Sequence, residues 1–194
     1  MPTPIGHALG GLLVGLVLGA AGAGGAGGAV RDDIKGSRPR GSRLPEWPRP
    51  ALLDLPGLAW PVLAACLPDV DFLWGRHNME THSIGFAVLV GLGIWLMTRK
   101  PWLSLICALA VGTHVLFDWL GSDDTPPLGV MALWPLSADF YFANAFIFEA
   151  ISRRYWLPNF FTHNTLAVLR ELAILLPPVG LALLVRRSLG HPQR

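Results

Sequence analysis

The sequence predicts an all-α integral membrane protein, built as a helical bundle with about five membrane helices (four or five). Two observations indicate this fold class. Of the 194 residues, 52% are hydrophobic and only 14% are charged, which is more apolar than an ordinary soluble domain. The apolar residues also gather in five stretches, which polar or turn-forming segments separate. At this length we expect one membrane-embedded domain over residues 1–194.

All five apolar stretches are predicted to be helices. They are Ile5–Val30, Ala51–Leu67, Ile84–Thr98, Pro101–Leu120 and Leu169–Val185. In the first stretch Gly11, Gly15 and Gly19 recur at every fourth residue, a spacing that lets two membrane helices approach closely. This stretch has no basic segment before it and no evident cleavage site, so we interpret it as a retained span rather than a signal peptide.

The second stretch is the least regular of the five. Asp54, Pro56 and Pro61 interrupt it, and proline in a helix interior removes a backbone hydrogen bond. The sequence leaves open whether residues 51–67 cross the membrane fully or form a short, tilted or re-entrant helix.

The basic residues predict the orientation of the chain. Eleven of the fifteen Lys and Arg side chains fall in segments that would share one side of the membrane, namely Arg31, Lys35, Arg38, Arg40, Arg43, Arg49, Arg99, Lys100, Arg186, Arg187 and Arg194. Because basic residues favour the cytoplasmic side, five crossings with the N-terminus outside and the C-terminus inside fit this distribution. Residues 31–50 are then a basic cytoplasmic loop, and residues 121–165 form an outer interfacial segment.

Composition also limits the partners of the chain. A net charge of +2 is too small to indicate a nucleic-acid partner. Cys66 and Cys107 both lie in apolar stretches and are interpreted as buried thiols, without a disulfide or a catalytic role. The lipid bilayer is the expected partner, and the oligomeric state stays open.

The segment between the second and third stretches is dense in candidate metal ligands. Asp69 and Asp71 lie two residues apart, and His77 and the sequence Thr81-His82-Ser83 follow them. Mixed carboxylate and imidazole ligation suits zinc or manganese. The alternative is a polar loop in which the aspartates cap helices. Thr81 and Ser83 are predicted to hydrogen-bond His82 and to set its tautomer.

The fourth stretch carries the most specific pattern. His114 and Asp118 are four residues apart, which puts both side chains on one face of a helix. His114 lies roughly 9 Å below the end of the stretch, inside the apolar zone. A bound cation would compensate for two ionisable groups at that depth. The alternative is a neutral histidine that hydrogen-bonds the aspartate.

Several other polar residues are weaker candidates. His7, near the start of the first stretch, is expected to complete the cluster from a third element, although a lone interfacial histidine is also common. Asp123 and Asp124 are either ligands or turn residues. Fainter candidates are Asp139, Glu149 and His163.

An aromatic and basic region follows the fourth stretch. Trp134, Tyr141 and Trp156 accompany Arg153 and Arg154 between residues 128 and 158. Such a surface lies at the lipid headgroups and would present a phosphate-bearing lipid to the site. The alternative is an aromatic belt with snorkelling arginines that has no role in recognition.

With these motifs in place, the chain resembles the LexA-regulated, membrane-bound predicted metal-dependent hydrolases of bacteria, a family distantly similar to zinc-dependent phospholipase C. The resemblance covers about residues 5–140 and rests on ordered motifs. These are His7 with Gly10, Leu67-Pro68-Asp69-Val70-Asp71, His77 through Thr81-His82-Ser83, His114 to Asp118, and Gly129 to Ser137. Two departures stand out, because Asn78 replaces the usual arginine and Asp123-Asp124-Thr125 replaces a hydroxyl-rich turn. The resemblance implies a metal site in a protein of the bacterial inner membrane.

The residues and the resemblance together predict a membrane-bound metal-dependent hydrolase. The expected metal ligands are His7, Asp69, Asp71, His77, His82, His114 and Asp118. One or more divalent ions, Zn²⁺ or Mn²⁺, would activate water at the outer helix ends, with Asp71 and Asp118 as catalytic residues. A phosphoester of a lipid or another membrane-associated molecule is the expected substrate, bound by Arg153 and Arg154. The alternatives are a divalent metal transporter or sensor, and a protein whose metal only holds helices together.

Overall fold

A computed structural model describes residues 2–22, 55–74, 77–123 and 126–190. Within these ranges the chain forms five α-helices, one 3₁₀ helix and no strand. The elements are α1 (Pro4–Gly22), α2 (Leu55–Cys66), η2 (Leu67–Trp74), α3 (Ile84–Thr98), α4 (Pro101–Leu120) and α5 (Phe160–Gly190). The predicted all-α fold with five helices is confirmed. The basic loop at residues 31–50 and the adjoining ends of the first two predicted stretches lie outside the described residues.

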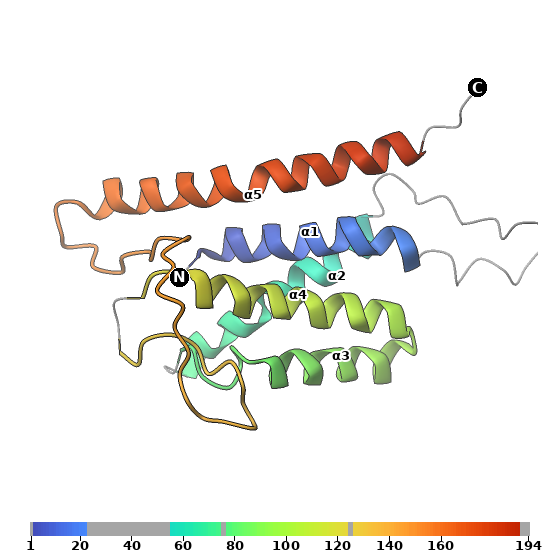
Figure 1. Cartoon of the computed structure of the whole chain (residues 1–194), viewed down its shortest axis with the longest axis horizontal. Helices are drawn as coiled ribbons and strands as arrows, with labels where there is room; N and C mark the ends of the chain where they lie inside the picture. The colour runs from blue at the N-terminus through green and yellow to red at the C-terminus, as the bar shows by residue number, and fades with distance from the viewer. Residues whose placement is uncertain (1, 23–54, 75–76, 124–125, 191–194) are drawn as a thin grey trace, which may run out of the picture.

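The helices pack as an antiparallel bundle in which α1 and α4 are central. α1 contacts α2, α4 and α5, while α3 contacts α4. Because the chain direction alternates, the start of α1, the end of α2, the start of α3, the end of α4 and the start of α5 lie at one end of the bundle (Figure 1). We call this the ligand end.

Glycines bring α1 and α2 into close contact. A Cβ atom on Gly11 would collide with the Pro61 carbonyl, and one on Gly15 would lie 2.7 Å from Pro61 Cγ. A Cβ on Gly19 would have no neighbour within 4 Å. The predicted close approach therefore holds for the first two glycines and fails for Gly19, which lies beyond the contact.

Small side chains fill the space between α2 and α4. Ala65, Cys107, Ala110 and Val111 are fully buried in one cluster, as expected where helices associate by close packing. Cys107 is a buried free thiol, and Cys66 is a half-buried one. The expectation of a buried thiol is therefore met by Cys107, whereas Cys66 is only partly buried. This packing ends one turn before His114, so it holds α4 firmly against its neighbours just below the ligand end.

The fifth helix begins nine residues earlier than predicted. It starts at Phe160 instead of Leu169, so the final residues of the predicted outer segment 121–165 are helical. The sequence analysis missed the start of this helix because it located helices by their apolar stretches, and polar residues such as His163 and Asn164 interrupt the apolar pattern there. Both side chains bond to the backbone that precedes the helix.

Two described helices are long and apolar enough to cross a membrane. They are Pro101–Leu120 and Phe160–Ser188. Two other apolar helices, Pro4–Gly19 and Ile84–Thr98, are shorter. The number of crossings and the orientation of the chain stay predictions.

Candidate metal centre

All seven predicted metal ligands lie together at the ligand end. Four separate segments supply them: α1 carries His7, η2 carries Asp69 and Asp71, the loop before α3 carries His77 and His82, and α4 carries His114 and Asp118. Two groups of these side chains, His7 with His114 and Asp118, and Asp69 with His77 and His82, have atoms close enough to share an ion.

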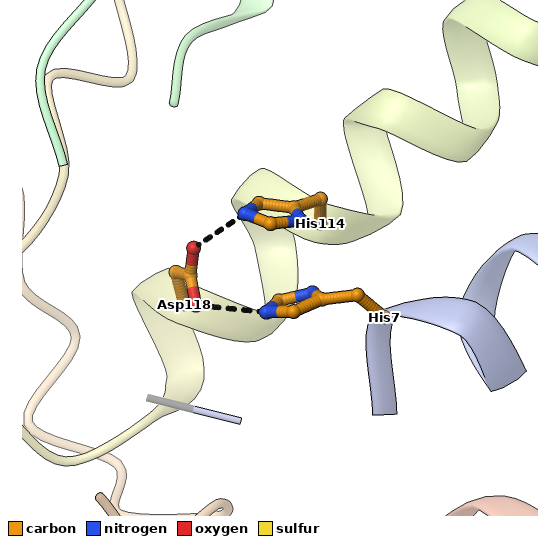
Figure 2. A group of neighbouring side chains, drawn as sticks. All are labelled: His7, His114 and Asp118. Carbon is orange, nitrogen blue, oxygen red and sulfur yellow. Dashed lines mark ion pairs between the residues drawn. The ribbon is translucent and has the colours of Figure 1, made fainter. Parts of the chain in front are cut away.

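The helix-borne half of the site consists of His7, His114 and Asp118 (Figure 2). The two imidazole rings stack with their centroids 3.6 Å apart. Asp118 faces both rings, with Oδ1 3.4 Å from His7 Nε2 and Oδ2 3.1 Å from His114 Nε2. All three side chains are at most 1% exposed. Two successive turns of α4 and the first turn of α1 therefore direct three potential metal-ligating side chains into one buried volume.

The other half of the site consists of Asp69 and Asp71 from η2 and His77 and His82 from the loop before α3. We call it the loop-borne half, and two of its side chains reach the same buried volume. His82 Nε2 lies 3.5 Å from Asp118 Oδ2 and 3.8 Å from Asp69 Oδ1. Asp69 Oδ1 is also 3.7 Å from His114 Nε2. We call the five side chains that converge here, His7, Asp69, His82, His114 and Asp118, the ligand cluster.

The spacing within the ligand cluster fits a divalent metal ion. Four donors at zinc bond lengths lie about 3.3 Å from one another in a tetrahedron, and the separations given above run from 3.1 to 3.8 Å. Nε2 of His82, Nε2 of His114 and both Asp118 oxygens are buried and have no hydrogen-bond partner among the described residues. Such orphaned atoms are costly unless something binds them, and a cation satisfies all of them together.

Two histidines are held in the tautomer that a metal requires. His114 Nδ1 lies 2.7 Å from the carbonyl oxygen of Ala65 and donates to it. His82 Nδ1 lies 3.2 Å from Asp71 Oδ2 and 3.0 Å from the hydroxyl of Thr81. With Nδ1 engaged, Nε2 of each ring is the nitrogen that faces the cluster and would bind an ion.

Asp71 lies behind the ligand cluster. Its side chain is 2% exposed, and its oxygens are 2.9 Å from His77 Nδ1 and 3.0 Å from the Thr81 hydroxyl, which donates to it. It thus joins His77, Thr81 and His82 in one network. His77 is 18% exposed and, unlike Asp71, lines the cavity beside the cluster.

These contacts set the charge of the loop-borne half. Burial alone would raise the pKa of Asp71, but hydrogen bonds with His77 and His82 outweigh burial and lower it. Burial alone would lower the pKa of His82, but the Asp69 and Asp71 carboxylates and the charge of Asp118 outweigh it and raise the pKa to about 9. Without a metal, the loop-borne half therefore holds a proton where the ion would bind.

A third buried carboxylate anchors the start of the helix that carries His7. Glu171 of α5 accepts hydrogen bonds from the Thr3 backbone N–H at 3.0 Å and from the Thr3 hydroxyl at 2.7 Å. The same hydroxyl accepts from the backbone N–H groups of Ile5 and Gly6 and so caps α1. A Cβ on Gly6 would collide with the Glu171 carboxylate, so the glycine before His7 makes room for this anchor.

The sequence analysis did not identify the Thr3 and Glu171 pair. Thr3 before Pro4 is a typical helix start, since threonine caps helices and proline favours the first helical position. Glu171 is a carboxylate in an apolar stretch, which signals a buried partner. Their pairing is a tertiary contact across 168 positions that neither signal specifies.

The backbone conformation near His82 explains why Ser83 and Asn78 occupy their positions. Ser83 caps α3 by accepting from the Phe86 backbone N–H at 3.0 Å, so Thr81 alone of the two predicted hydroxyls bonds His82. Asn78 has a φ of 69°, a left-handed conformation that asparagine tolerates better than most residues. This conformation accounts for asparagine at a position where the resembling family has arginine.

A cavity of about 640 Å³ opens beside the ligand cluster. His7, Asp69 and Asp118 line one part of it, and Arg153 and Arg154 line another. The predicted substrate-binding arginines and the predicted ligands therefore face one space.

The weaker candidates have other contacts. Asp123 lines the cavity and accepts from the Gly129 backbone N–H at 3.0 Å, while Asp124 lies outside the described residues. Asp139 bonds Ser137, and Glu149 pairs with Arg170. His163 Nε2 lies 2.8 Å from the Ala150 carbonyl oxygen, a backbone contact away from the ligand cluster.

Comparison with known proteins gives the chain a family. A family model described as YdjM inner membrane protein matches residues 1–188. The chain belongs to this family. Neither the curated proteins nor the solved structures contain a match. Membership of the YdjM inner membrane protein family agrees with the predicted membrane protein and gives its location as the inner membrane.

Proposed function

We propose that this protein is a membrane-bound metal-dependent hydrolase that acts on a phosphoester of a lipid or another membrane-associated molecule. One observation carries the proposal. Five side chains of metal-ligating types converge at the edge of a cavity that two arginines also line. Several of their nitrogen and oxygen atoms are buried and have no hydrogen-bond partner among the described residues. The sequence resemblance to predicted metal-dependent hydrolases and to zinc-dependent phospholipase C supports it.

The ligand cluster is the proposed metal site. His7, His82 and His114 supply imidazole nitrogens, and Asp69 and Asp118 supply carboxylate oxygens. This donor set suits Zn²⁺, with Mn²⁺ as a second choice. A bound ion of this kind lowers the pKa of a coordinated water and stabilises negative charge on a phosphoryl oxygen. The two carboxylates balance the charge of the ion near the apolar zone.

Asp71 and His77 have different proposed roles. Asp71 is a positioning residue, because it holds both His82 and His77 and does not line the cavity. A group that exchanges a proton with a bound substrate must reach the cavity, and His77 does so with its Nδ1 held by Asp71. The role first expected for Asp71 as a proton acceptor thus passes to His77.

The decisive experiment measures metal content and turnover on the same purified protein. We expect metal in the detergent-solubilised chain and metal-dependent hydrolysis of a phospholipid or phosphodiester substrate. His114→Ala should lose both, because it removes a buried ligand. Asp139→Asn is the matched control, since Asp139 is an exposed aspartate that bonds only Ser137 through its side chain among the described residues.

Two outcomes would contradict the proposal. Bound metal without turnover of any phosphoester would favour a metal that only holds the helices together. Ion flux in proteoliposomes, abolished by His114→Ala and retained in Asp139→Asn, would favour a transporter.

A further inference from the structure

Residues 150–154 line the cavity, end on its two arginines and are separated from the start of α5 by residues 155–159. We call this segment the strap. Within the strap, Ser152 donates its backbone N–H to Asn164 Oδ1 at 2.8 Å and accepts from Asn164 Nδ2 at 3.0 Å. His163 donates to the Ala150 carbonyl oxygen at 2.8 Å. The first turn of α5 thus fixes the backbone directly before Arg153.

The side chain of Arg153 is also fixed. Its guanidinium lies over the Phe72 ring, 4.5 Å from the centroid. His77 also stacks on Phe72, with the ring centroids 3.9 Å apart, so the Phe72 ring contacts both Arg153 and His77. A stacked guanidinium keeps its N–H groups free at the ring edge for an anion. Arg153 and Asp69 line the same cavity, yet no ion pair joins this arginine to Asp69 or Asp118 among the described residues. The guanidinium is therefore separate from the carboxylates of the ligand cluster.

The arginines of the strap differ from the next arginine along the chain. Arg170 pairs with Glu149 at 3.3 Å. No carboxylate pairs with Arg153 or Arg154 in the part of the chain that the structure describes. Two unneutralised guanidinium groups in one cavity attract an anion, and their planar geometry matches phosphate.

The same cavity has another polar group without a partner. Asn78 lines it and is 6% exposed. Its Oδ1 atom is buried and has no hydrogen-bond partner among the described residues. Because Oδ1 is an acceptor, it would take a hydrogen-bond donor, such as a hydroxyl group beside the phosphate of a ligand.

We propose that Arg153 and Arg154 bind a second phosphate group of the substrate, apart from the phosphoester at the ligand cluster. This inference rests on the proposed function, and it defines the substrate class as a membrane-associated molecule with a phosphodiester and a remote phosphate monoester. Arg153 is the main contact, and Phe72 and Asn164 are its positioning residues.

The test compares two lipids that differ by one phosphate. Binding of dihexanoyl phosphatidylinositol 4-phosphate and of dihexanoyl phosphatidylinositol is measured by calorimetry on the full chain in detergent. A charge-assisted hydrogen bond is worth about 1.5 to 3 kcal/mol, so we expect the first lipid to bind roughly 10- to 100-fold more tightly. Arg153→Gln should remove most of this preference, and Phe72→Leu and Asn164→Ala should reduce it.

Arg170→Gln is the control, because it removes an arginine whose charge is already paired with Glu149. Arg170→Gln should keep the full preference for the phosphorylated lipid. All variants are compared only where their metal content and melting temperature equal those of the wild type. The proposal is overturned if the wild type binds both lipids equally, or if the preference survives in the Arg153→Gln, Arg154→Gln double variant. Inorganic phosphate that binds as tightly as the phosphorylated lipid would overturn the assignment to a membrane-associated molecule.

Binding is measured without turnover, so the two proposals fail separately. An Arg153-dependent preference in a protein that hydrolyses no phosphoester supports the phosphate subsite and contradicts the hydrolase. Hydrolysis with equal binding of both lipids supports the hydrolase and overturns the subsite.

Discussion

The two halves of the candidate metal centre are built differently. In the helix-borne half, His7, His114 and Asp118 project from packed helices, and both Asp118 oxygens have no hydrogen-bond partner among the described residues. In the loop-borne half, Asp71 contacts both His77 Nδ1, at 2.9 Å, and His82 Nδ1, at 3.2 Å. Packing therefore sets the position of the first half, while a polar network sets the position of the second.

This difference indicates which half depends on a bound ion. The loop-borne network satisfies most of its own polar atoms, so it keeps its geometry without metal. The helix-borne half leaves buried donors unsatisfied, and a cation would remove that cost. Substitutions in the helix-borne half should therefore affect metal binding most, and substitutions in the network should act indirectly.

The largest effect is expected from Asp118→Asn. This change keeps the shape of the side chain but removes the charge that faces both His7 and His114. We expect metal affinity to fall by more than the roughly 10- to 100-fold that is typical of losing an outer partner. Metal content after dialysis against a chelator series measures it. A fall of only a few-fold would show that the helix-borne half is not the principal site.

Asp71→Asn should have the next largest effect. It weakens the hold on His82 but leaves every atom of the ligand cluster, so we expect a loss of roughly 10- to 100-fold in metal affinity. Thr81→Val, which removes a second contact to the same His82 nitrogen, should act in the same direction and less strongly. If Asp71→Asn lowers metal affinity as much as Asp118→Asn does in the same chelator series, Asp71 is itself a ligand.

The affinity for metal should depend on pH through the loop-borne half. The raised pKa of His82, about 9, means that its proton must leave when the metal binds. Affinity should therefore rise as the pH increases toward 9, by up to about tenfold per unit for one displaced proton, and level off above it. In Asp71→Asn the plateau should begin at a lower pH, because one carboxylate that raises the pKa is lost. Competition with a metal indicator from pH 6.5 to 9.5 measures both curves, and parallel flat curves would refute the assignment.

The smallest effect on metal affinity is expected from Gly6→Ala, which changes no ligand and tests the anchor of the helix-borne half through its stability. The new methyl group would displace the Glu171 carboxylate from Thr3, at a cost of about 1 to 3 kcal/mol. A lower melting temperature in detergent measures it. Gly93→Ala is the control, because a Cβ there has no neighbour within 4 Å. Equal melting temperatures for both variants would mean that Glu171 does not hold α1.

The helices and the spatial grouping of the candidate ligands were accessible from the sequence. Apolar stretches located the five helices, since membrane helices need long apolar segments. The His114 and Asp118 spacing required only helical geometry to place both side chains together. The convergence of His7 with them followed from assigning polar residues in apolar segments to one end of the bundle.

The division of roles was not accessible from the sequence. Asp69 and Asp71 are equivalent in the sequence pattern, yet only one lines the cavity, because the twist of η2 decides which carboxylate faces the cluster. The start of α5 was predicted too late because it contains polar residues such as Asn164, whose side chain hydrogen-bonds the backbone of the strap. Contacts of this kind depend on where the helices pack, and local pattern does not encode them.

The Thr3 and Glu171 contact has a consequence for biosynthesis. The two residues are 168 positions apart, so the first ligand-bearing helix leaves the ribosome long before its anchor is made. At about 5 to 20 residues per second, the interval is on the order of 10 to 30 seconds. During that time Thr3 lacks its partner on α5, so the start of α1 becomes anchored only after the last helix has been synthesised.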